Sequence, residues 1–171
     1  MITICLFGPE SVGKTTLATI LCEHFDAIHV PEVSREMVFD NNFSIKDIIN
    51  IGKAQTNAIL EAQKSGKQLV ICDTDLITTQ LYSKIYLDQV PDILFDLEQK
   101  IVFDQYFLLD IDVPWVADGL RDLGHRRSEI YLMFKNELDK RAIDYVKVNG
   151  DWDQRTQTVI DAIKSRFDTI A

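Results

Sequence analysis

The chain has 171 residues, 46% of them hydrophobic and 26% charged, which is typical of one globular domain with a substantial core. Its formal net charge is −9 and no basic block stands out, which argues against nucleic acid as a partner. No apolar segment is long enough to span a membrane, and the three cysteines form no C-x-x-C pair, so we expect free thiols in a reducing, cytoplasmic compartment.

The first predicted element is a buried strand over the apolar run Ile2–Phe7. It leads into residues 8–15, which read GPESVGKT and match the phosphate-loop pattern G-x-x-x-x-G-K-[ST] at every required position. Apolar residues at helical spacing then predict a helix from about Gly13 to Phe25. The motif therefore lies between a strand and a helix, where binding of a nucleoside triphosphate requires it.

The chemistry of this loop explains its residue types. Glycine at positions 8 and 13 permits backbone angles that let the loop's N–H groups converge on an anion. Lys14 is placed to neutralise charge on the outer phosphates of ATP, and Thr15 offers a hydroxyl to Mg²⁺. The alternative is a chance turn before Lys-Thr, which the flanking strand and helix disfavour. The residues expected at the ATP site are Gly8, Glu10, Ser11, Val12, Gly13, Lys14, Thr15 and Thr16.

Strands and helices alternate through the rest of the chain. We expect further strands at 27–30, 69–72, 106–109 and 145–148. Helices are expected at 33–40, 44–65, 91–97, 128–141 and 151–170, and another helix after Asp75 should include Tyr82 and Tyr86. Each strand is a continuous apolar run, as in a parallel sheet that is covered on both faces. The pattern predicts a single domain over 1–171 of the α/β class: a three-layer phosphate-loop NTPase, similar to nucleoside and nucleotide kinases, with a five-stranded parallel sheet.

Acidic residues follow several of these strands. Ligands of such sheets bind at the carboxyl ends of the strands, a rule that gathers Gly8, Glu32, Asp73 and Asp112 along one edge. Asp73 is expected to hold Mg²⁺ together with Thr15; its alternative role is to cap the next helix. Asp75 is expected either to cap that helix or to contact the substrate.

Glu32 follows the second strand and could accept the proton of an attacking hydroxyl group. In phosphoryl transfer such a base would orient the hydroxyl more than activate it. The alternative is a surface acid that pairs with Arg35 or with the start of the next helix.

Three arginines in seven residues, Arg121, Arg126 and Arg127, lie among glycines between a strand and a helix. They suggest an arginine-containing lid that closes on ATP and brings positive charge to the transferred phosphoryl group. The alternative is a solvated loop. Trp115 and Tyr82, with Tyr86, could stack on a planar ring, although core packing is the default for each.

These residues together resemble the ribosylnicotinamide kinase domain at the C-terminal end of NadR-type NAD-biosynthesis proteins. The resemblance covers nearly the whole chain. Four groups of residues carry it. The first is GPESVGKTTL at 8–17, and the second is PE at 31–32 with RE at 35–36. The third is DTD at 73–75 with TT at 78–79 and Tyr82, and the fourth is DVPWV at 112–116 with DGLRDLG at 118–124. The last segment is the most specific of the four.

The resemblance implies a kinase that moves the γ-phosphoryl group of ATP to the 5′-hydroxyl of nicotinamide riboside and requires Mg²⁺. It would place Glu32 and Arg35 at the riboside and Arg121 in the lid. Two departures follow: Pro31 stands where an aromatic residue would bind a ring, and no His-x-Gly-His nucleotidyltransferase signature occurs. We therefore expect a stand-alone kinase without an adenylylation step or a DNA-binding region.

Other functions share the same motif. A kinase for another nucleoside or a nucleoside monophosphate would use the same loop, Asp73 and arginines. An ATPase module acting on a protein partner is also compatible with the loop. A GTP switch is disfavoured, because the segment after the last strand reads KVNGD at 147–151 in place of the Asn-Lys-x-Asp element that reads the base. The pattern does not indicate an oligomeric state.

Overall fold

The computed structural model describes residues 1–38, 42–116 and 123–167. Its centre is one five-stranded parallel sheet with the strand order β2-β3-β1-β4-β5. The strands are β1 (Ile2–Phe7), β2 (Ile28–Val30), β3 (Leu69–Cys72), β4 (Gln105–Leu109) and β5 (Tyr145–Val148). The predicted number, direction and positions of the strands are therefore confirmed, with ends that differ by one residue at β2 and β4.

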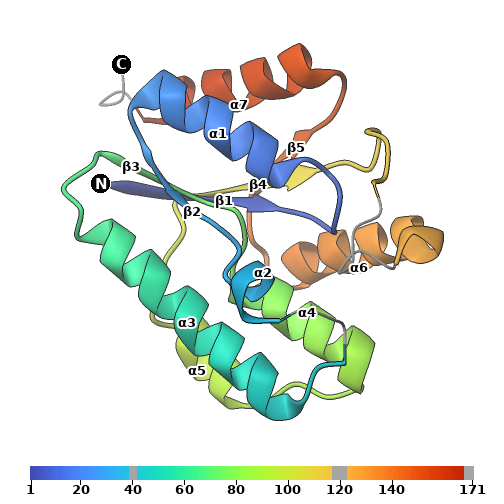
Figure 1. The fold of residues 1–171 in the computed structure, drawn as a ribbon. Helices are drawn as coiled ribbons and strands as arrows, with labels where there is room; N and C mark the ends of the chain where they lie inside the picture. Colours follow the sequence, from blue (N-terminus) through green and yellow to red (C-terminus); the bar gives the residue numbers. More distant parts are fainter. Residues whose placement is uncertain (39–41, 117–122, 168–171) are drawn as a thin grey trace.

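Helices cover both faces of the sheet, which gives the expected three layers. Figure 1 shows α1 and α7 on one face and α3, α4, α5 and α6 on the other. The helices are α1 (Lys14–Phe25), α2 (Ser34–Met37), α3 (Ile45–Gln63), α4 (Leu76–Leu87), α5 (Ile93–Glu98), α6 (Arg127–Lys140) and α7 (Trp152–Arg166), with a short 3₁₀ turn η1 (Gly124–Arg126) before α6. Within the described residues, none of these helices combines the length and the apolar character needed to cross a bilayer.

Two helices are shorter than their sequence patterns suggested. The helix expected at 33–40 is the single turn α2, because Val38 is already extended, with φ −133°. The closing helix was expected to reach Ile170, but α7 ends at Arg166, where Phe167 leaves the helical conformation. Residues 39–41 and 168–171 lie outside the described part of the chain.

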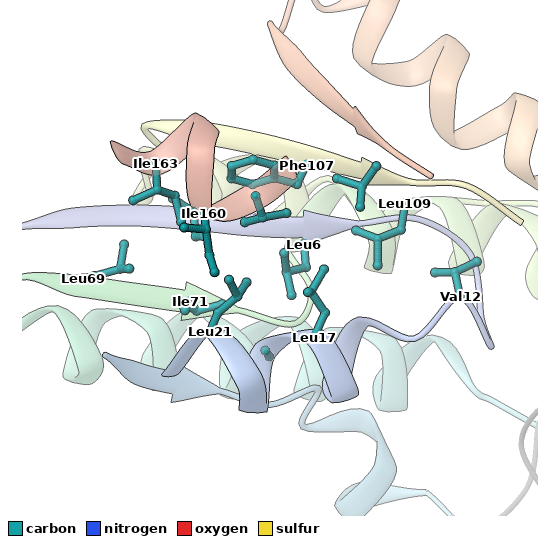
Figure 2. Close-up of a cluster of buried hydrophobic side chains, with 14 residues drawn as sticks. Leu6, Val12, Leu17, Leu21, Leu69, Ile71, Phe107, Leu109, Ile160 and Ile163 are labelled. Atoms are coloured by element: carbon teal, nitrogen blue, oxygen red, sulfur yellow. The ribbon is translucent and has the colours of Figure 1, made fainter. Parts of the chain in front are cut away.

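One core cluster fixes α1, and with it the phosphate loop, to the sheet. Figure 2 shows Leu17 and Leu21 of α1 reaching toward Leu6 of β1 and Ile71 of β3. All four side chains are fully buried. Each such residue contributes roughly 1.5–3 kcal/mol through burial. Because α1 begins directly after the loop, this packing holds the loop at the end of β1.

Ser44 and Asp47 cap the start of α3. The backbone N–H of Asp47 donates to Ser44 Oγ at 3.2 Å, and the backbone N–H of Ser44 donates to Asp47 Oδ2 at 2.8 Å, which makes a reciprocal capping box at the start of α3. The three cysteines are free, and Cys5 and Cys72 are buried in the central strands.

Candidate active site

The phosphate loop adopts the backbone that its glycines allow. Gly8 and Gly13 have φ of 146° and 85°, so the expectation for both positions is confirmed. Ser11 also lies in the left-handed region, with φ 58°. A residue with a Cβ pays a conformational cost there, so its neighbours must hold it in place. A Cβ on Gly13 would lie 2.3 Å from the ring of Trp152, which therefore packs directly on the loop.

Lys14 and Thr15 are held by hydrogen bonds to the phosphate loop and to Asp73. Lys14 Nζ donates to the carbonyl oxygens of Gly8 and Pro9, at 2.9 and 2.7 Å. The ammonium group is thereby held at the mouth of the loop. Thr15 Oγ1 donates to Asp73 Oδ2 at 2.5 Å, so the two residues expected to share a metal ion are in contact. Thr16 is exposed in the first turn of α1.

Asp73 has the surroundings of a metal ligand. Its side chain is buried, and Oδ1 has no hydrogen-bond partner among the described residues. Burial alone would raise the pKa of Asp73, but His29, the Lys14 ammonium and the Thr15 hydroxyl together hold that pKa below its ordinary value. An ionised carboxylate and a hydroxyl fit Mg²⁺, which takes few protein ligands and completes its shell with phosphate oxygens and water.

A pocket opens between the phosphate loop, α2, α3 and α4. Glu10 and Lys14 of the loop line it together with Glu32 and Arg35 from the segment after β2. Arg35 Nε lies 3.2 Å from Glu32 Oε2, so the ion pair considered as the alternative for Glu32 is present. The pair nevertheless faces the same pocket as Lys14. The pocket therefore places a carboxylate and a guanidinium opposite the phosphate loop.

Gln55 of α3 holds the segment that carries Glu32. Its Oε1 accepts a hydrogen bond from the Val33 N–H at 3.0 Å, and its Nε2 donates to the Pro31 carbonyl at 3.2 Å. Gln55 is buried and also lines the pocket. Sequence reasoning missed it, since a single glutamine on a helix carries no motif.

An aromatic wall forms the far side of the pocket. Phe43 and Tyr86 have ring centroids 5.3 Å apart, and Tyr82 stacks on Tyr86 with centroids 6.2 Å apart and an angle of 24° between the planes. The hydroxyl of Tyr82 accepts a hydrogen bond from the Glu10 N–H at 3.0 Å, which links the wall to the phosphate loop. Phe43 was not among the residues expected at the site.

Asp75 is not among the residues that line this pocket, and its contacts match the capping alternative. Its carboxylate is buried at the N-cap of α4, where Oδ1 accepts from the backbone N–H of Thr78 at 2.8 Å. Oδ2 accepts from the Tyr106 hydroxyl at 2.9 Å. Burial raises the pKa of Asp75 to about 6. The geometry supports the capping alternative, because both carboxylate oxygens of Asp75 are engaged by Thr78 and Tyr106 at the start of α4.

Trp115 is likewise not among the residues that line the pocket. Its Nε1–H donates to Glu10 Oε1 at 3.3 Å, and its ring packs so closely on Gly124 that a Cβ there would lie 2.7 Å away. The backbone N–H of Leu123 donates to the same Glu10 oxygen at 3.0 Å. Glu10 therefore ties the phosphate loop to the chain after β4.

The three arginines of the expected lid have different surroundings. Arg121 lies outside the described residues. Arg126, at the end of η1, pairs with Glu129 of α6 through two exposed hydrogen bonds, of 2.9 and 2.7 Å, which matches the solvated alternative and does not place it at ATP. Arg127 reaches the loop, where Nη2 donates to the Ser11 carbonyl at 3.2 Å. Of the two described arginines, only Arg127 contacts the phosphate loop.

A fourth arginine, absent from the sequence-based assignment, lies beneath the loop. Arg155 of α7 is fully buried, and its Nη1 donates to the Val12 carbonyl at 3.0 Å. It also pairs with Asp112, the acid that the strand-end rule brought to this edge. The Arg155 side chain meets the Val12 backbone across most of the length of the chain, so no local pattern could reveal the contact.

Comparisons with known proteins agree with this geometry. A family model described as an AAA domain matches residues 3–155. The trifunctional NAD biosynthesis/regulator proteins NadR of Escherichia coli K12 and Salmonella typhimurium LT2 are each 32% identical over 95% of this chain and 42% of their own length. The chain thus spans less than half the length of the curated relatives it matches, and the resemblance seen in the sequence is confirmed.

Solved structures share the fold. A NadR protein in complex with NR superimposes with a TM-score of 0.86 at 22% identity, over 96% of this chain and 51% of that one. Deoxyadenosine kinase from M. mycoides gives 0.73 at 15% identity, over 96% and 100% of the two chains. Thymidylate kinase from Ehrlichia chaffeensis gives 0.68 at 18% identity, over 96% and 98%. The fold is therefore that of the phosphate-loop nucleoside and nucleotide kinases.

Proposed function

This chain belongs to the AAA domain family, and we propose that it is an ATP-dependent kinase that phosphorylates the 5′-hydroxyl of nicotinamide riboside to give nicotinamide mononucleotide. The observation that carries the proposal is a single pocket that joins Lys14 of the phosphate loop, the Glu32–Arg35 pair and an aromatic wall. The similarity to NadR proteins over 95% of this chain supports the same acceptor.

The chemistry of the pocket suits this acceptor. Nicotinamide riboside carries a planar, positively charged pyridinium ring. The faces of Tyr86 and Phe43 offer stacking area and attract such a cation, an interaction worth about 0.5–2 kcal/mol. The ribose would lie between this wall and the Glu32–Arg35 pair, so that its 5′-hydroxyl faces Lys14. Pro31 lies outside the lining residues, so the aromatic contact comes from α4 and the segment before α3.

Each protein group then has a defined part in the transfer. Glu32 accepts the hydrogen bond of the 5′-hydroxyl and takes its proton as the oxygen bonds to the γ-phosphorus. The bond between that phosphorus and the β–γ bridging oxygen breaks, and ADP leaves. Lys14 stabilises charge on the outer phosphates. Thr15 and Asp73 would hold Mg²⁺, which neutralises phosphate charge when bound.

Product identification tests the proposal. The protein is incubated with ATP, MgCl₂ and nicotinamide riboside, and the products are identified by mass spectrometry. We expect ADP and nicotinamide mononucleotide in equal amounts, and no product from the 5′-deoxy analogue. Lys14→Ala should abolish the reaction while the far-UV circular dichroism spectrum stays unchanged, because Lys14 acts outside the core. Absence of the mononucleotide from an ATP-binding preparation would refute the proposed acceptor.

A further inference from the structure

We infer that Arg127 and Arg155 are positioning residues that orient the backbone N–H groups of the phosphate loop toward the phosphates of the nucleotide. The inference rests on the proposed function only in that the loop binds a nucleotide. Two guanidinium groups from different helices donate to two consecutive carbonyls of the loop, those of Ser11 and Val12. Neither arginine lines the pocket that contains Lys14 and Glu32.

Arg155 joins three loops at the edge of the sheet. Its Nη1 donates to the Val12 carbonyl, its Nε donates to the Gly150 carbonyl at 3.0 Å, and its Nη2 donates to the Asp110 carbonyl at 2.9 Å. The Asp112 carboxylate pairs with the same guanidinium and offsets the cost of burying its charge. The planar fork of arginine donors therefore fixes the phosphate loop relative to the ends of β4 and β5.

Arg127 holds the strained residue of the loop. Ser11 has a left-handed backbone, and its hydroxyl accepts a hydrogen bond from the Val116 N–H at 2.8 Å, while its carbonyl accepts from Arg127. The Nε of Arg127 is buried and has no partner among the described residues. The hydrogen bond to the Ser11 carbonyl is the one that the Arg127 guanidinium makes to the described residues, which points to a role in holding the Ser11 peptide.

Because peptide units are planar, holding the two carbonyls also sets the direction of two N–H groups of the loop. In a planar trans peptide the C=O and the N–H of one unit point in opposite directions. The Ser11 carbonyl belongs to the same unit as the Val12 N–H, and the Val12 carbonyl to the same unit as the Gly13 N–H. Donors that hold both carbonyls on the outer side therefore turn both N–H groups to the inner side, where phosphate binds.

The positive charge of the two arginines also favours binding of an anion by the loop. A cationic donor at a carbonyl polarises the peptide and strengthens the N–H on its other end. Trp152 packs over Gly13 on one side, and the Arg155 guanidinium lies 5.9 Å from the centre of that ring. Arg155 is fully buried, so water does not compete for its donors. Arg127 and Arg155 thus preorganise the N–H donors of the phosphate loop before the nucleotide binds.

The test compares affinities for ADP and AMP by isothermal titration calorimetry in Mg²⁺ buffer. AMP shares the base, ribose and first phosphate of ADP but has no β-phosphate to enter the loop. We expect Arg127→Gln to lower the ADP-to-AMP affinity ratio about tenfold, because the variant loses a charge-assisted bond to the loop. Arg155→Lys should lower the ratio at least as much, because lysine lacks the planar fork of donors that holds three carbonyls at once. Arg141→Lys, far from the loop and paired with Glu98 and Glu137, is the matched control and should leave the ratio unchanged.

Each outcome decides the inference. An unchanged ratio in Arg127→Gln, or an equal loss of ADP and AMP affinity in both variants, would overturn it, since a merely structural role weakens both ligands alike. Arg127 is only half-buried, so its variant decides the question even if Arg155→Lys fails to fold. No acceptor is present, so a protein that binds ADP but does not phosphorylate nicotinamide riboside would refute the proposed function and leave this inference standing.

Discussion

Glu32 is the residue whose role in the proposed transfer can be separated most clearly from binding of ATP. Its carboxylate faces the pocket opposite Lys14 and pairs with Arg35. We expect Glu32→Gln to lower kcat by about 10²–10⁴, the range for loss of a general base, while the KM for ATP changes little. Steady-state kinetics at saturating acceptor measure both values. An effect confined to ATP binding would mean that Glu32 is not at the acceptor site.

Gln55 acts through the backbone that carries Glu32, so its effect should depend on Glu32. Loss of its bonds to Val33 and Pro31 in Gln55→Ala should displace the carboxylate and lower kcat by about tenfold. In the Glu32→Gln background, Gln55→Ala should lower kcat only slightly further, because the carboxylate that Gln55 positions is no longer present. Full additivity of the two effects on kcat would show that Gln55 works independently of Glu32.

Asp75 gives a pH dependence of stability with a definite sign. Its folded-state pKa is raised from 3.8 to about 6 by burial, so the native state holds more protons than the unfolded state between these values. Stability should therefore fall as the pH rises from about 4 to 6 and stay level above that, a total of roughly 3 kcal/mol for this one group. Asp75→Asn retains the cap and should lack this component in urea titrations across the window. An identical pH profile in both proteins would contradict the assignment.

At the scale of the element, the capping box stabilises the start of α3, which contributes residues to the pocket. Ser44 begins the helix that carries Gln55, and Phe43 directly precedes it. Ser44→Ala removes the acceptor for the Asp47 N–H and should lower the free energy of unfolding by about 1 kcal/mol. Urea denaturation measures the change, with Ser65→Ala, near the other end of the same helix, as the control. Equal stability of the two variants would refute the contribution of the cap.

Strands were predictable and helix ends were less so, for a physical reason. β3 occupies the position that its apolar run indicated, because a strand buried on both faces has no polar positions inside it. The end of α7 depends on Phe167, which leaves the helix although it continues the apolar spacing. Helix ends reflect local capping and tertiary contacts more than periodicity.

At the scale of the whole molecule, the sheet explains which site residues could be found from the sequence. The phosphate loop, Glu32 and Asp73 follow strands, and parallel strands bring their carboxyl ends together. Phe43, Gln55 and Arg155 come to the site from helices and the segments beside them, through contacts across long stretches of chain. Such packing leaves no local pattern. Asp75 also follows a strand, but its buried carboxylate caps α4, so a position after a strand does not by itself place an acid in the pocket.

The central claim is that turnover of ATP depends on one particular acceptor, and acceptor-dependent ADP release tests it most directly. ADP release is measured with Mg²⁺ and ATP in the presence of nicotinamide riboside, of other nucleosides, of nucleoside monophosphates, and without acceptor. We expect the highest kcat/KM for nicotinamide riboside, because its cationic ring matches the wall of Phe43 and Tyr86. Preference for another nucleoside, or equal ADP release without any acceptor, would contradict the account.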